Sequence, residues 1–118
     1  MEDDPGLGRL LDLDGFLAEI GAGYWVKIEA RRVQPDSARP RGVAYSLTLH
    51  APDGRRMLGL DNAHVVRATR GPAGKSRAAH DHSHRGETVR PYRYSNADAL
   101  MDDFWREVRA LLRSEGIE

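Results

Sequence analysis

YSLTLHAPDGRRMLGLDNAHVV, residues 45–66, predicts the antiparallel hairpin on which the rest of the fold is built. Apolar and polar residues alternate through 45–50, and this period of two indicates a strand that buries one face. The APDG turn that follows has proline at its second position and glycine at its fourth, which is typical of a tight reversal. The next strand, 55–66, is therefore expected to return antiparallel to the first.

A cover for this sheet is predicted by residues 95–116, SNADALMDDFWREVRALLRSEG, which have the pattern of one long amphipathic helix. The apolar residues follow helical spacing without a miss: Ala97, Leu100, Met101, Phe104, Trp105, Val108, Leu111 and Leu112. Ser95 and Asp98 resemble a capping box at the start, and Gly116 can end the helix. A lone helix of this length needs a tertiary surface, so its apolar stripe is expected to pack on the sheet.

Two more segments have the pattern of strands. YWVKIEARRV, residues 24–33, alternates apolar and polar side chains in the same way as the hairpin. ETVRPYRYS, residues 87–95, predicts a fourth strand, which Pro91 places at an edge because proline has no backbone donor. The polar stretches between the strands, 34–42 and 67–79, are expected to be loops.

The N-terminal stretch LDLDGFLAEIG, residues 11–21, fits either of two structures. Asp14 can cap a short helix. That helix would carry Phe16, Leu17 and Ile20, whereas LLDL could instead form an edge strand, and we favour the helix. The predicted fold is α+β: an antiparallel sheet of about four strands, with a long C-terminal amphipathic helix and a short N-terminal helix packed on one face.

Composition and charge narrow the class of protein. The chain of 118 residues fits a single domain, 1–118, and its lack of cysteine excludes disulfides and thiolate metal sites. No apolar run is long enough for a membrane helix, and the acidic start is unlike a secretory signal, so we expect a cytoplasmic protein. The net charge is −5 over residues 1–20, +8 over 21–93 and −3 over 94–118. The basic middle favours a polyanion or an acidic partner, although arginines also solvate strand edges.

Histidines gather in two places that flank the second loop. His64 follows Asp61 and Asn62 in LDNAH. Three others occupy alternate positions in HDHSHR: His80, His82 and His84. Side chains at every second position of a strand leave by the same face. If the segments on either side of the loop are strands, both groups of histidines meet at the same end of the sheet.

Three chemistries fit such a cluster. His80, His82 and His84, together with His64 or Asp61, can bind zinc or another divalent ion through nitrogen and oxygen. Alternatively, two histidines on either side of a phosphodiester can remove and return protons without a metal, because both protonation states of imidazole are accessible near neutrality. Arg85 or Arg67 would then stabilise the charge on the phosphorane. The third interpretation is an exposed histidine-rich loop with nothing bound.

The basic middle favours phosphate chemistry and RNA. Candidate RNA-binding residues lie around the histidines: Arg67, Arg70, Lys75, Arg77, Arg90, Tyr92 and Arg93. Tyr92 and Tyr94 share one face if the chain is extended there, and aromatic rings so placed can stack on the bases of single-stranded RNA. Aromatic residues also fill strands, so packing of these tyrosines is the alternative. No cofactor is expected, apart from the divalent metal of the first chemistry.

The chain resembles the TumE family, proposed toxins of type II toxin-antitoxin pairs. The resemblance covers most of the chain and consists of motifs in order: YWVKIEARR, YSLTLHAPDG, LDNAH, HDHSHRG, PYRYSNA and DDFWREV. It implies a small α+β protein encoded beside a DNA-binding antitoxin, which neutralises it by forming a complex. The polar residues of the family pattern fall here on Asp61, Asn62, His64, His82 and His84.

These observations together predict a cytoplasmic toxin-like protein with a metal-independent ribonuclease activity centred on His64, His82 and His84. One of His64 and His82 would be the general base and the other the general acid. Asp61 would orient His64, and Arg85 would stabilise the phosphorane. Two alternatives stay open: a non-catalytic module that binds a partner protein or nucleic acid, and a protein that binds a divalent metal. The uncovered edge strand also allows a homodimer.

Overall fold

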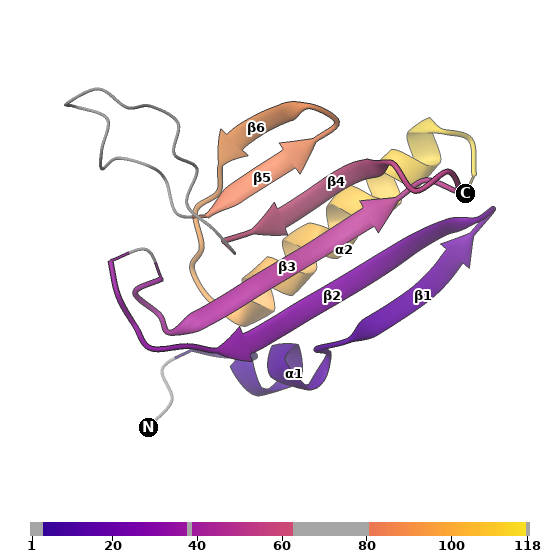
Figure 1. Cartoon of the computed structure of the whole chain (residues 1–118). Coiled ribbons are helices and arrows are strands. Elements are labelled where there is room, and N and C mark those ends of the chain that lie inside the picture. The colour runs from indigo at the N-terminus through magenta and orange to yellow at the C-terminus, as the bar shows by residue number, and fades with distance from the viewer. Residues whose placement is uncertain (1–3, 38, 63–80, 118) are drawn as a thin grey trace.

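The computed structural model describes residues 4–37, 39–62 and 81–117. The strands form one antiparallel sheet in which each strand pairs with its neighbours in sequence, in the order β1-β2-β3-β4-β5-β6 (Figure 1). Their bounds are β1 Phe16–Gly21, β2 Tyr24–Arg32, β3 Val43–His50, β4 Arg56–Asp61, β5 His82–Arg85 and β6 Thr88–Pro91. The helices are α1, Leu7–Asp12, and α2, Ala97–Ser114. The predicted α+β class is confirmed, with six strands rather than four.

Both helices lie on the same side of the sheet. Figure 1 shows α2 running behind β3 and β4, while α1 lies beside β2 at the other edge. The side chains between these layers form the core, and the largest of them come from the middle strands and α2: Ile28, Tyr45, Leu47, Leu49, Leu100, Phe104 and Val108. We call this side of the sheet the core face and the opposite side the open face.

The predicted hairpin and the predicted long helix are both confirmed. β3 pairs with β4 around the APDG turn, and Leu47 and Leu49 are buried as the alternation required. The apolar stripe of α2 packs on the core face. The helix is capped by Asn96 rather than by Ser95, because the Asn96 side chain accepts a hydrogen bond from the backbone N–H of Ala99 at 2.8 Å. No helix of the described residues is long and apolar enough to cross a membrane.

The expected helix over the N-terminal stretch is wrong. Residues Phe16–Gly21 form β1, which pairs with β2 and places Phe16 opposite Ile28. The short helix lies earlier in the chain, as α1. Asp14 does not cap a helix, because its side chain accepts a hydrogen bond from the backbone N–H of Ala30 in β2 at 2.9 Å. This contact fixes the chain against the sheet and leads it directly into β1.

The region expected to hold one further strand holds a second hairpin. β5 and β6 pair around Gly86, and β5 also pairs with β4. The HSHR stretch is therefore a strand, as the predicted placement of its histidines on one face requires. β6 is the edge strand, as Pro91 predicted, and all of its residues are exposed. The chain then leaves the sheet and runs through Tyr92 and Tyr94 to α2.

Candidate functional site

A carboxylate and two imidazoles meet on the open face, where β4 pairs with β5. The register places Asp61 opposite His82, and Gly59 opposite His84. Leu58 and Leu60 point to the core, and side chains alternate along a strand, so Asp61 and its two histidine neighbours leave the sheet on the side away from α2. We call Asp61, His82 and His84 the Asp–His cluster.

The Asp61 carboxylate lies between the two imidazoles. Its Oδ2 atom is 3.0 Å from His84 Nε2, which is hydrogen-bond distance, and its Oδ1 atom is 3.9 Å from His82 Nδ1, which is too long for a hydrogen bond. The side chains of Asp61, His82 and His84 are 8%, 6% and 12% exposed. Oδ1 is a buried acceptor without a hydrogen-bond partner among the described residues. Such an atom is rare in native proteins and often marks a functional position.

His84 is held at both ring nitrogens. Arg56 Nη2 lies 3.2 Å from His84 Nδ1. A guanidinium can only donate, so Nδ1 carries the lone pair, and the proton of the neutral ring sits on Nε2 and is donated to Asp61. Burial lowers the pKa of His84 below its ordinary value of 6.5; Arg56 and His82 lower it further, against the opposing effect of Asp61. The imidazole is therefore neutral at pH 7 and fixed in one tautomer.

Arg56 is the cation of the site, and the sequence pattern alone does not place it there. Strict alternation from Leu58 would point Arg56 to the core face. The register of β3 and β4 shifts at this point: Leu49 pairs with Leu58, but His50 pairs with Arg56, so β4 has one extra residue. A bulge of this kind re-aims the side chains beyond it. Met57 packs against the core, and Arg56 reaches across the open face to His84.

Gly59 provides the space over which Arg56 crosses. A Cβ atom at this position would lie 3.0 Å from Thr48 Cγ2 and 3.2 Å from the carbonyl oxygen of Leu47. It would also contact Arg56 Cδ at 3.7 Å. The close approaches of such a Cβ are to Thr48 and Leu47, so the absence of a side chain at Gly59 lets β3 and β4 pair closely beneath the Arg56 side chain.

The residues next to the cluster in sequence hold the ends of the strands. Asn62 continues the β4 edge with its side chain: Oδ1 accepts from the backbone N–H of Tyr45 at 2.9 Å, and Nδ2 donates to the carbonyl of Val43 at 3.0 Å. On the core face the Tyr45 hydroxyl donates to Asp81 Oδ2 at 2.6 Å. Burial raises the pKa of Tyr45, so this hydroxyl keeps its proton. These contacts fix the strand ends that carry Asp61 and His82.

Several predicted site residues lie outside the described residues. These are His64 and His80 of the histidine set, and Arg67, Arg70, Lys75 and Arg77 of the RNA-binding set. The expected approach of His64 to His82 and His84 therefore stays a prediction. Within the described residues no group of three or more His, Asp or Glu side chains is arranged to hold a metal ion.

Arg85 lies on the other side of the sheet from the cluster. It is opposite Leu58 in the register, and its Nη2 atom is 3.5 Å from Glu107 Oε1 of α2. Together with Ser83, Thr88 and neighbouring groups it lines a polar hollow of about 370 Å³ between the β5–β6 hairpin and α2. The structure thus brings Asp61, His82 and His84 together and separates Arg85 from them by the thickness of the sheet.

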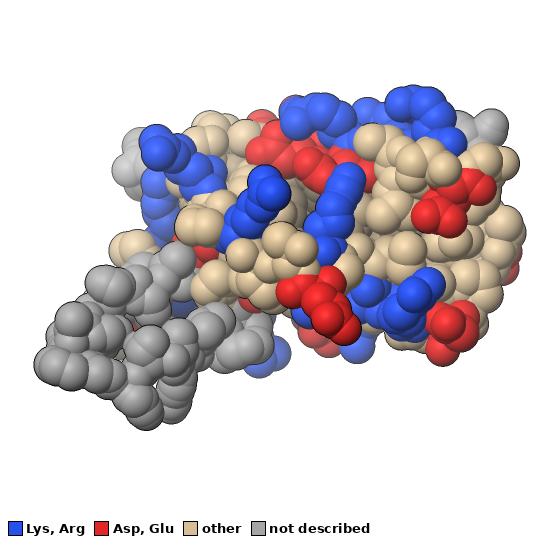
Figure 2. Space-filling model, turned by 90° about the horizontal axis from the view of Figure 1, so that it is seen from above, with Lys and Arg blue, Asp and Glu red and all other residues tan. Residues whose placement is uncertain are grey.

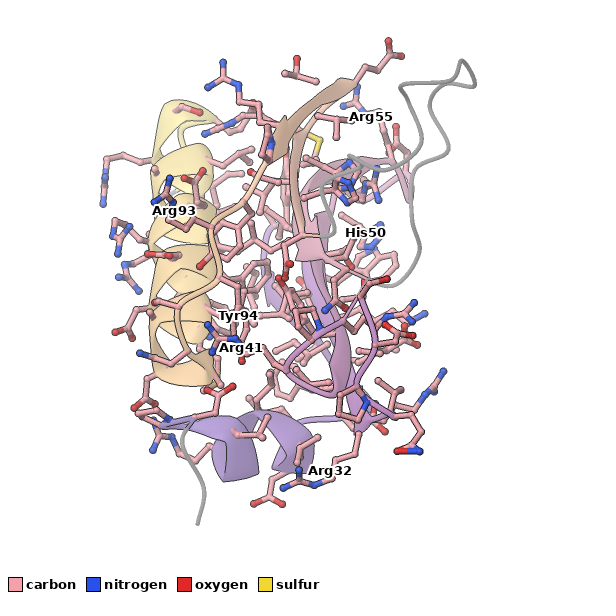
Figure 3. The ribbon with its side chains drawn as sticks, turned by 90° about the vertical axis from the view of Figure 1, so that its left-hand side faces the viewer. Arg32, Arg41, His50, Arg55, Arg93 and Tyr94 are labelled. Carbon is pink, nitrogen blue, oxygen red and sulfur yellow. The ribbon has the colours of Figure 1, made fainter. Side chains whose placement is uncertain are left out.

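The two candidate stacking tyrosines are packed beside α2. The Tyr92 hydroxyl donates to Asp103 of α2 at 2.6 Å, and burial raises the pKa of Tyr92. The Tyr94 ring stacks on Tyr45 with centroids 5.6 Å apart, and the Arg41 guanidinium lies 5.1 Å from its centroid. Figure 3 shows Arg41 and Tyr94 next to each other on the side of α2. Both rings remain partly exposed, so contact with a base stays a prediction.

The described part of the surface mixes both signs of charge. Figure 2 views the molecule from the β5–β6 side, where basic and acidic side chains are interspersed and form no continuous basic stripe among the residues described. Arg90 and Arg93 are both exposed, as an RNA-binding role requires. Among the described residues Arg56 is the cation in contact with the cluster, and its position depends on the bulge rather than on the charge pattern.

Comparison with known proteins identifies one family. A family model described as Toxin TumE matches residues 18–112, which include β2 to β6 and most of α2. No curated protein and no solved structure matches the chain. The matched residues contain the whole Asp–His cluster and Arg56.

Proposed function

Because this chain belongs to the toxin TumE family, we propose that it is the toxin of a toxin-antitoxin pair and that it cleaves RNA without a metal ion. The observation that carries the ribonuclease proposal is the contact series Asp61–His84–Arg56 on the open face. It joins an orienting carboxylate, a neutral imidazole and an exposed cation in the order that acid-base catalysis on a phosphodiester requires.

His84 is the proposed general base. The Asp61 carboxylate holds the proton on Nε2, so the lone pair of Nδ1 faces Arg56. An incoming phosphate competes for the guanidinium, and Arg56 can turn from Nδ1 to a phosphate oxygen. Nδ1 is then free to accept the proton of a ribose 2′-hydroxyl, and the lowered pKa keeps the ring neutral and ready to accept it. His84 and Arg56 are also more exposed than His82, so RNA meets them first.

The reaction then needs one group that returns a proton. The 2′-oxygen attacks phosphorus, and the 5′-oxygen leaves with a proton from an acid, which yields a 2′,3′-cyclic phosphate and a 5′-hydroxyl. His82 shares the Asp61 carboxylate, and its ring centroid is 6.1 Å from that of His84. We assign the acid to His82, with His64 as the second candidate because it follows β4 closely in sequence.

Arg56 takes the role that the sequence suggested for Arg85. A phosphorane carries more negative charge than the ground state, so a guanidinium that reaches it from the open face stabilises the transition state. Arg85 is directed to the other face and pairs with Glu107. These two arginines therefore form a matched pair for testing the site.

The test uses purified protein without a His tag and a single-stranded RNA in the presence of EDTA. We expect cleavage that leaves 2′,3′-cyclic phosphate ends, read by mass spectrometry. His84→Ala and Arg56→Ala should each slow cleavage by about 100-fold or more. Arg85→Ala removes an exposed ion pair on the other face and should keep most of the activity.

Three results would overturn this proposal. Loss of cleavage in EDTA that added metal restores would favour the divalent-metal protein instead. If Arg85→Ala cleaved RNA as slowly as Arg56→Ala, the active site could not be assigned to the open face. Growth arrest without any RNA cleavage, unchanged in His64→Ala and His84→Ala, would favour the non-catalytic binding module.

The toxin role itself is tested in cells. We propose that a DNA-binding antitoxin encoded beside this chain neutralises it in the cytoplasm by forming a complex. Induced expression of the chain alone should arrest growth, and co-expression of the neighbouring gene product should relieve the arrest. Co-purification of the two proteins, followed by measurement of their stoichiometry, would also show whether the toxin is a monomer or a homodimer in that complex.

A further inference from the structure

A braced aromatic ring lies on the open face, apart from the Asp–His cluster. Trp25 of β2 stacks on His50 of β3, with ring centroids 4.0 Å apart and planes within 7°. His50 is itself fixed at both nitrogens: Nδ1 is 3.2 Å from the carbonyl of Gly54, and Nε2 is 2.9 Å from the hydroxyl of Thr48. One face of the indole is therefore occupied by a ring that is itself held in place.

The other side of Trp25 borders a hollow. This hollow has a volume of about 330 Å³ and is lined by Leu17, Ala18, Glu19, Gly23 and Trp25. No β3 residue lines it, so it lies on the side of the indole away from His50. Leu17 is 63% exposed and forms an apolar wall. The Glu19 carboxylate accepts a hydrogen bond from the backbone N–H of Gly23 at 3.0 Å, which fixes the rim.

This hollow and the cluster share one face of the sheet. Three strand steps separate β2 from β5, and Trp25 lies two residues along the strands from the row that contains Lys27, Thr48, Gly59 and His84. Strand spacing and rise then put Trp25 roughly 16 Å from His84. Figure 3 shows His50 on the side of the sheet away from α2, as this register requires.

The surface between them carries cations. Arg56 reaches His84 from the row of Trp25 and His50, and Lys27 is the next open-face residue of β2 after Trp25. Lys27 is about half exposed and makes an ion pair with Glu29 at 3.6 Å. Solvent screens this pair because both side chains are exposed. A negatively charged backbone can thus run from the cluster past Arg56 and Lys27 to Trp25.

We propose that Trp25 is a stacking platform for one base of a single-stranded RNA whose backbone lies at the Asp–His cluster. The inference rests on the proposed ribonuclease function and names its substrate as an unpaired strand. In single-strand binding proteins, bases stack on the free face of an aromatic ring in this way. The ring is held in position when another group packs against its opposite face. His50 provides that support. The hollow receives the base rather than a phosphate, because the charged group in its lining is the Glu19 carboxylate.

A protein partner fits this surface less well. Among the described residues, the large hydrophobic side chains that are exposed are Leu17 and Val89. They belong to β1 and β6, the two opposite edges of the sheet. The open face therefore presents one aromatic site beside a polar track, whereas a protein-docking surface usually has a continuous apolar patch.

The test uses the two tryptophans of the chain as separate reporters. Trp105 lies on α2 against Phe104, so the Trp105→Phe protein keeps Trp25 as its fluorophore. The probe is a 2′-O-methylated single strand, which binds but cannot supply the 2′-hydroxyl for cleavage. We expect this strand to quench the Trp105→Phe protein and to leave the Trp25→Phe protein unquenched. Trp25→Ala should bind the strand about tenfold more weakly or worse, and Trp25→Phe should retain most of the affinity.

Each alternative outcome has a distinct meaning. A Trp25→Ala variant that binds the strand as tightly as the parent would overturn the platform, whatever its cleavage rate. Unchanged RNA affinity together with lost neutralisation by the antitoxin would assign the surface to a protein and would equally overturn it. Strand binding that depends on Trp25, in a protein that cleaves no unmodified RNA, would support the platform and refute the proposed ribonuclease.

Discussion

Asp61→Asn separates the chemistry of the cluster from its stability. The substitution keeps the shape of the side chain and removes its charge. Among the described residues Oδ1 of Asp61 is a buried acceptor without a hydrogen-bond partner, which costs roughly 1–3 kcal/mol, and more when the group is charged. The asparagine can still accept from His84 Nε2 through its carbonyl oxygen. We therefore expect the free energy of unfolding to stay within about 1 kcal/mol of the parent or to rise, which corresponds to about 4 °C in Tm.

The effect on cleavage should be far larger. The asparagine carbonyl and Arg56 still favour the tautomer with its proton on Nε2, but without the carboxylate no negative charge stabilises the imidazolium that forms when His84 Nδ1 takes a proton. The loss should amount to about 100-fold to 10,000-fold in kcat, the range of general acid-base catalysis. Urea unfolding measures the first quantity, and single-turnover cleavage in EDTA measures the second.

A matched control is available on the same face. Glu29→Gln makes the same change of charge on an exposed residue that pairs with Lys27, and it should leave both quantities nearly unchanged. If Asp61→Asn cleaved RNA at the parent rate, the charge of Asp61 would have no part in the reaction. If it instead lost more than about 3 kcal/mol of stability, the view of Oδ1 as an unsatisfied acceptor would be wrong.

Three further predictions concern pH, the strand ends and the floor of the site. The pKa of His84 is lowered in the folded protein, so the unfolded chain binds more protons below about pH 6.5 and stability falls on acidification through that range. His84→Gln should reduce the difference in unfolding free energy between pH 7.5 and pH 5.5, measured by urea unfolding. An equal difference in the variant and the parent would refute this. Asn62→Ala leaves two buried backbone groups of β3 without partners and should cost about 2–4 kcal/mol of unfolding free energy, whereas a loss below 1 kcal/mol would contradict this role. Gly59→Ala should force Thr48 aside at a cost of about 1–3 kcal/mol, so a variant with parental Tm would show that the space is unimportant.

Local sequence patterns predicted those elements for which the sequence preference and the tertiary packing favour the same secondary structure. The hairpin of β3 and β4 combines a clear alternation with a turn of specific chemistry, and α2 combines a long apolar stripe with a cap. The N-terminal stretch had no such agreement. Phe16, Leu17 and Ile20 fit helical spacing, while Phe16, Ala18 and Ile20 fit a strand equally well, and in so short a run only pairing with β2 decides.

The candidate site was predictable as far as strict alternation held. His82 and His84 share a face because β5 is regular, and Asp61 joins them because β4 pairs with it in register. The sequence pattern does not place Arg56 at the site, because the bulge at Met57 breaks the alternation between Arg56 and Leu58. Arg85 was assigned to the site because it adjoins His84 in sequence, but neighbours in a strand point to opposite faces.

Helix α2 follows the sheet in the chain, and this order sets when the sheet can become rigid. The strands form by local pairing of neighbours, which needs little of the chain at once. Their apolar side stays uncovered until Phe104 and Val108 leave the ribosome and close over Leu47 and Leu60. Until α2 has packed, the sheet and the Asp–His cluster that it carries therefore lack rigid support. A partner that recognises the finished sheet can therefore bind only after α2 has emerged and packed.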